Sequence, residues 1–171
     1  MGVLASINYS KTEAPRGGGI YFLSGDYEVE VNACKDIITQ KNEEMFILET
    51  KIIESTNALL PEGTRPAWTQ KFQGPAAQVA PQNMKMLWCA LMNLNIFDPK
   101  DAAAIAAITE ADWRAFATEA ISDGQPLAGA RLHVCAFKTK NKAGGEFTKH
   151  TFTPPKNPTE FQIAMRKEAT K

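Results

Sequence analysis

The sequence RLHVCAFKTKNKAGGEFTKHTFTP, from Arg131 to Pro154, decides how this chain is expected to fold. Its two flanks, RLHVCAF and EFTKHTFTP, have the alternating pattern that favours β-strands. Between the flanks lie three lysines and the pair Gly144–Gly145, which is typical of a hairpin turn. The segment therefore predicts a β-hairpin with a basic end.

A two-residue turn at these glycines sets the expected register of the hairpin. It would place Lys140 opposite Lys149, and Phe137 opposite Phe152. Since side chains alternate along a strand, one face would then carry Lys138, Lys140, Phe147 and Lys149. Directly opposed lysines repel each other, and an anion lying between them would relieve that repulsion. The alternative is that the lysines only keep a sheet edge soluble.

The strand pattern is also found in the first half of the chain. In SGDYEVEVNACKDI the residues expected on one face are Tyr27, Val29, Val31 and Ala33. The polar stretch TQKNEE separates this run from MFILETKIIES, which is rich in strand-favouring residues. The two runs predict a first hairpin, and AWTQKF predicts a third strand that ends before Gly74.

A helical segment is predicted over residues 80–123. Apolar side chains recur at helical spacing in PQNMKMLWCALMNLNIF. Asp98 followed by Pro99 is typical of a helix N-cap with a first-turn proline. Thr109 and Asp112 have the spacing of a capping box, so a further helix is expected to begin there.

The element order is therefore hairpin, strand, helices and hairpin. A five-stranded Greek-key barrel of the OB type has this order, with its helix between strands 3 and 4. The expected fold class is mainly β, with an OB-like barrel over residues 21–155. A flexible N-terminal arm, 1–20, would precede the barrel, and a C-terminal tail, 156–171, would follow it.

Composition restricts the classes of partner. The 171 residues include 19 basic and 19 acidic side chains, so the formal net charge is zero. Because the chain has no overall positive charge, an anionic partner would have to bind to local clusters of basic side chains. Three cysteines without a CxxC pair favour a reducing compartment, and no apolar run reaches membrane-spanning length. A cytoplasmic protein that contacts no membrane and needs no cofactor is expected.

Several stretches together carry a resemblance to a known family: SGDYEVEV, KNEEMFILETKIIES, TQKFQG, MKMLWCALMNLN and LAGARLHVCAFKTKNKAGGEFTKHTFTP. In them the chain resembles a group of phage-encoded proteins that have a single OB-like domain and are linked to single-stranded DNA binding. The resemblance covers roughly residues 20–155. It implies a non-enzymatic protein that binds single-stranded DNA with little sequence preference, in phage DNA replication or recombination and in the host cytoplasm.

An OB barrel grips a nucleic-acid strand between the loop joining strands 1 and 2 and the loop joining strands 4 and 5. Here these loops are expected at Ile37–Glu44 and Lys138–Glu146. The interaction needs basic side chains for phosphates and aromatic faces for bases. Trp68 could serve as a stacking surface or as a core residue. The candidate nucleic-acid-binding residues are Lys138, Lys140, Lys142, Lys149, Phe147, Phe137, Trp68, Lys71 and Lys41.

Catalytic signatures are lacking in the sequence. It has no phosphate-binding glycine loop, no HExxH motif and no nucleophile elbow, so no enzyme is expected. His133, Cys135 and His150 would share a face in the register above, but a zinc site would lack a fourth ligand. The expected metal content is therefore none.

Two other functions stay open at this point. Zero net charge and a long, acid-containing helical segment would suit a protein-interaction module that recruits or inhibits a replication or host enzyme. A structural or assembly subunit is the third alternative. The sequence also leaves open RNA as the partner in place of DNA, and the formation of a homo-oligomer.

Overall fold

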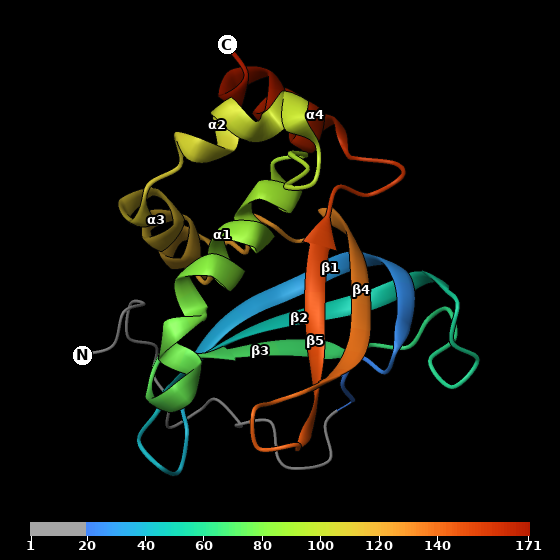
Figure 1. Ribbon diagram of the computed structural model, residues 1–171. Helices are drawn as coiled ribbons and strands as arrows, with labels where there is room; N and C mark the ends of the chain where they lie inside the picture. Colours follow the sequence, from blue (N-terminus) through green and yellow to red (C-terminus); the bar gives the residue numbers. More distant parts are fainter. Residues whose placement is uncertain (1–19) are drawn as a thin grey trace.

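The computed structural model describes residues 20–171 of the chain (Figure 1). Within them, an antiparallel sheet of five strands is combined with four α-helices and two short 3₁₀ turns. The strands are β1 (Gly25–Ile38), β2 (Glu44–Ser55), β3 (Ala67–Lys71), β4 (Arg131–Lys140) and β5 (Glu146–Thr153). The helical elements are η2 (Gly74–Gln78), α1 (Ala80–Leu91), η3 (Pro99–Asp101), α2 (Ala102–Ala106), α3 (Glu110–Ala120) and α4 (Glu160–Ala169).

The strand order in the sheet is β3-β2-β1-β4-β5. This confirms the prediction of a mainly β fold with its main helical segment between the third and fourth strands. The sheet is not closed into a barrel. No backbone ladder joins the edge strands β3 and β5 within residues 20–171, and α1 packs against both of them (Figure 1). β3 is only five residues long, because Gly74–Pro75 begins the turn η2 soon after it.

β1 lies at the centre of the sheet and changes face part-way along its length. Tyr27, Val29 and Val31 are buried, as the alternation predicted. The prediction that Ala33 continues this face is wrong, since a register irregularity falls between Val31 and Ala33. Cys34 takes the core position instead, and burial raises the pKa of its thiol to about 12.

The core lies between the sheet and the helices α1 and α3. From α1, Met84, Leu87 and Leu91 are fully buried, as their helical spacing predicted. From α3, Phe116 contacts Trp88 of α1, with ring centroids 4.0 Å apart. These contacts fix α1 over the inner face of the sheet and beside its two open edges.

The predicted helix starts are confirmed. The Asp98 carboxylate accepts a hydrogen bond from the backbone N–H of Lys100 at 2.9 Å. Thr109 and Asp112 form a reciprocal capping box at the start of α3. Both caps satisfy backbone donors that a helix start would otherwise leave unpaired.

Residues 156–171, expected to be a tail, contain the helix α4, which packs onto the domain. Gln162 of α4 has no exposed surface. Its Nε2 donates to the carbonyl oxygens of Leu91, at 3.2 Å, and Arg131, at 2.8 Å. Arg166 of α4 makes two hydrogen bonds, of 2.7 and 2.9 Å, to the carboxylate of Asp101. The folded unit therefore continues past residue 155.

No helix in residues 20–171 combines the length and the hydropathy that crossing a bilayer requires.

Candidate nucleic-acid interface

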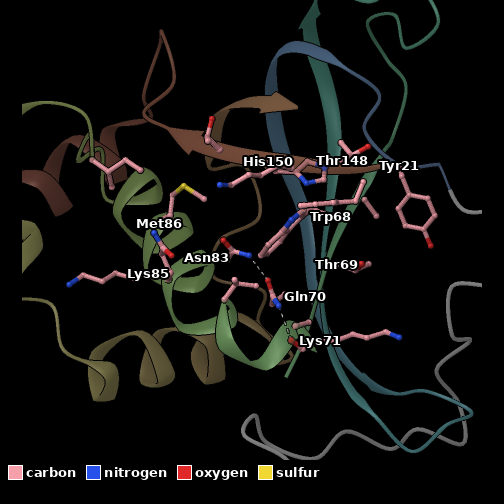
Figure 2. Close-up of a pocket in the computed structure, with 18 of the residues that line it drawn as sticks. Tyr21, Trp68, Thr69, Gln70, Lys71, Asn83, Lys85, Met86, Thr148 and His150 are labelled. Atoms are coloured by element: carbon pink, nitrogen blue, oxygen red, sulfur yellow. Dashed lines mark hydrogen bonds between the residues drawn. The ribbon is translucent and has the colours of Figure 1, made fainter. Parts of the chain in front are cut away.

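A cavity of about 930 Å³ lies between β3, β5 and α1 (Figure 2). We call it the seam cavity, because it lies where a closed barrel would join β3 to β5. β3 contributes residues 67–71, β5 contributes 147–151, and α1 contributes its first two turns. Its volume is within the range of small-molecule and cofactor pockets in proteins.

The charged side chains that line the seam cavity are all basic. Its charged side chains are Lys71, Lys85 and Lys149, and no carboxylate from the described part of the chain lines it. Burial lowers the pKa of His150 to about 4, so its imidazole is neutral at pH 7. A chain with zero net charge thus gathers three positive charges around one cavity.

The three lysines differ in their partners. Lys71 Nζ lies 2.9 Å from Glu43 Oε2, and Lys85 Nζ donates to the carbonyl oxygen of Ile108 at 2.9 Å. Lys149 makes no ion pair with any residue between 20 and 171. In Figure 2 the ammonium groups of Lys71 and Lys85 extend away from the centre of the cavity, toward opposite sides. They therefore lie at its rim.

Aromatic side chains also line the cavity, and three of them are exposed. The exposed fractions are 44% for Tyr21, 66% for Phe97 and 47% for Phe147. Exposed rings of this size offer faces on which bases can stack. Trp68 also lines the cavity but is only 5% exposed, because it packs against Phe152. Trp68 thus belongs to the core and offers little surface for stacking.

The predicted register of the C-terminal hairpin is wrong by three residues. Lys140 pairs with Glu146, and Phe137 pairs with Lys149. The turn spans residues 141–145, because the Asn141 carbonyl Oδ1 accepts hydrogen bonds from the backbone N–H groups of residues 143 and 145, at 3.0 and 2.8 Å. An asparagine side chain that binds backbone donors ahead of it stabilises such a turn. The two-residue turn at Gly144–Gly145 does not form.

This register separates the residues that were expected to share one face. Lys138 and Lys140 lie on one face of the hairpin, while Phe147 and Lys149 lie on the other with Phe137. The loops themselves, 39–43 and 141–145, lie within the predicted limits. The candidate residues outside the cavity lining are all exposed: Lys41, Phe137, Lys138, Lys140 and Lys142.

The candidate residues that line the seam cavity are Lys71, Lys149, Phe147 and Trp68. Three further residues of the site were not among the candidates: Tyr21, Lys85 and Phe97. Phe97 could have been considered from the sequence, because it follows the apolar stripe of α1 and directly precedes the Asp98 cap. No sequence pattern pointed to Lys85, since a lysine on an amphipathic helix is usual.

His133, Cys135 and His150 are not brought together. His133 and Cys135 share one face of β4, whereas His150 faces the side of Val134 and Phe152. The ring of His133 instead lies 2.9 Å from the Glu28 carboxylate. No group of three metal-binding side chains is found in the described residues.

No protein-family model and no curated protein matches this chain.

Proposed function

We propose that this protein is a non-enzymatic binder of single-stranded DNA, and that it holds the strand in the seam cavity. The observation that carries the proposal is the cavity lining, which combines three lysines with three exposed aromatic rings and lacks any described carboxylate. A single strand presents phosphates and unpaired bases, and both find partners here. Lys71, Lys85 and Lys149 would contact phosphates, and bases would stack on the exposed rings.

The sheet also fits a partly open OB barrel. Its strand order and the position of its helices are those of the OB type, which need not be fully closed. In this variant α1 packs against both edges, β3 and β5, so the strand would enter at the seam. The resemblance to phage-encoded proteins suggests that the protein acts in DNA replication or recombination, in the host cytoplasm.

The lysines at the end of the C-terminal hairpin extend the basic surface. Lys138, Lys140 and Lys142 are exposed and form no ion pair within residues 20–171. They lie toward the tip of the hairpin that carries Lys149. We assign them, with Lys41, to weak contacts with phosphates that leave the cavity.

Binding of an oligo-dT strand, followed by fluorescence anisotropy over a series of salt concentrations, tests the proposal. With about three phosphates neutralised in the cavity, log affinity should fall with log salt at a slope of about −2. The double variant Lys85→Gln and Lys149→Gln should bind more weakly and show a slope nearer −0.7.

The matched control is the double variant Lys156→Gln and Lys171→Gln. It removes two lysines outside the cavity, each paired with a glutamate, and should bind as the wild type does. Equal affinity of the cavity variant and the control would refute the proposal. Repeating the titration with oligo-U separates a preference for DNA from one for RNA.

A second function is favoured by one observation. β5 pairs only with β4 within the described residues, so one of its edges stays available beside the cavity. An extended peptide could add to that edge, which would make the protein an interaction module for a replication or host enzyme. Failure to bind any oligonucleotide, combined with capture of a partner that the oligonucleotide does not displace, would favour this function.

A further inference from the structure

Two amide side chains are joined across the seam cavity. Gln70 of β3 donates from Nε2 to the carbonyl oxygen of Lys71 at 2.7 Å. Asn83 of α1 donates from Nδ2 to Gln70 Oε1 at 2.8 Å. Figure 2 shows Asn83 reaching from the helix toward Gln70 on the strand. Both residues line the cavity.

This chain of hydrogen bonds fixes the orientation of the Asn83 amide. A backbone carbonyl can only accept, so the amide of Gln70 must direct its nitrogen to Lys71 and its oxygen to Asn83. That oxygen in turn requires the nitrogen of Asn83. Gln70 is 4% exposed and therefore has little freedom to turn away.

The fixed Asn83 amide has hydrogen-bonding capacity left over. An asparagine has two N–H donors and a carbonyl acceptor, and only one of the donors is used by residues in the described part of the chain. One donor and one acceptor thus remain at the wall of the cavity. Such a pair is complementary to the edge of a nucleobase, and asparagine binds the N6 and N7 atoms of adenine in this way.

We infer that Asn83 recognises the hydrogen-bonding edge of one unpaired adenine held in the seam cavity, with Gln70 as its positioning residue. This inference rests on the proposed function, and it adds a base preference to a surface that otherwise binds strands through charge and stacking. The Asn83 carbonyl oxygen accepts a hydrogen bond from the N6 amino group of adenine, and the Asn83 amide N–H donates one to N7. A base without the N6 amino group leaves the Asn83 carbonyl without a partner, at a cost in affinity.

The test compares two DNA strands that differ only in the N6 amino group of one base. One is an oligo-dT strand with a single central adenine, and the other has unsubstituted purine at that position. Both bases stack as purines, so a difference in affinity reports the amino group. We expect the wild type to prefer adenine by about tenfold, the usual order for one good base contact. In Asn83→Leu this ratio should fall to about one, and in Gln70→Leu it should also fall.

Gln82→Leu is the matched control, since it removes the neighbouring amide of α1, which lines the cavity and is exposed. It should keep the tenfold ratio. Asn83→Ala, which favours the helix, replaces Asn83→Leu if the larger side chain impairs folding. A wild type that binds both strands equally, or an Asn83 variant that keeps the ratio, would overturn the inference while leaving the proposed function intact. A wild type that binds neither strand would overturn both.

Discussion

The indole of Trp68 on β3 packs edge-on against the ring of Phe152 on β5, with the ring centroids 4.9 Å apart. These are the two edge strands of the sheet, so its edges meet through side chains rather than through backbone hydrogen bonds. Trp68 also lines the seam cavity, so the contact lies beside it.

Phe152→Ala should lower the free energy of unfolding by about 3–5 kcal/mol, because Phe152 is fully buried and its loss leaves a cavity beside Trp68. Phe147→Ala, on the same strand but 47% exposed, should change it by less than about 0.5 kcal/mol. Urea denaturation of both variants checks this. Similar losses for the two would mean that Phe152 does not hold the strand edges together.

Phe97→Ala should weaken binding of oligo-dT by about tenfold without lowering stability, because the ring is 66% exposed and offers its surface to a base. Leu59→Ala is the control, as Leu59 is also exposed but lies in the β2–β3 loop and does not line the cavity. Anisotropy titrations at one salt concentration give both affinities. An unaltered affinity of the Phe97 variant for oligo-dT would show that this ring does not contribute to binding.

Stability should fall as the pH is lowered from about 6.5 to about 4. Burial lowers the pKa of His150 from 6.5 to about 4, so in this window the unfolded chain binds a proton that the folded chain does not. The stabilisation is fully present above pH 6.5, and about 2 kcal/mol of it should be lost by pH 5.

Urea denaturation at pH 7.5 and pH 5 measures that loss, and His150→Gln supplies the comparison. The variant should show a smaller difference between the two pH values, even if its stability is lower at both. An equal pH dependence in the wild type and the variant would show that another group is responsible.

Arg166→Met should lower the free energy of unfolding by about 2 kcal/mol, because Asp101 is buried and would keep only its hydrogen bond from the Asn95 N–H. The paired arginine also holds the pKa of the Asp101 carboxyl below its usual range. Lys171→Met breaks an exposed pair with Glu168 of α4 and should have no measurable effect. Urea denaturation gives the free energy of unfolding of both variants. A loss for the Arg166 variant alone would show that its ion pair anchors α4.

The strands and helices could be predicted because their residues carry the pattern locally. The alternation in β1, the apolar stripe of α1 and the capping box at Thr109 each depend on neighbours within a few residues. The hairpin register could not be predicted from glycines alone, because the side chain of Asn141 selects a longer turn. One asparagine thus moved Lys149 to the face opposite Lys138.

The site was predicted only in part because it depends on contacts between distant segments. Lys149 and Phe147 follow from the hairpin, and Lys71 from the third strand. Lys85 and Phe97 join them only because α1 packs beside the sheet edges. The packing of α4 onto the domain could not be predicted for the same reason, since Gln162 binds the backbone carbonyl groups of the distant residues 91 and 131.

The central position of β1 also has a consequence for how the chain folds during synthesis. β1 pairs with β2 through a short turn, but Val29 pairs on its other side with Leu132, roughly a hundred residues later. At ribosomal rates of about 5–20 residues per second, that side of β1 waits several seconds for β4. Charged side chains at Asp26, Glu28 and Glu30 interrupt the apolar residues of β1 during this interval. Like charges on an open strand edge oppose pairing with a second nascent chain, so we expect these acids to slow aggregation until β4 has been synthesised.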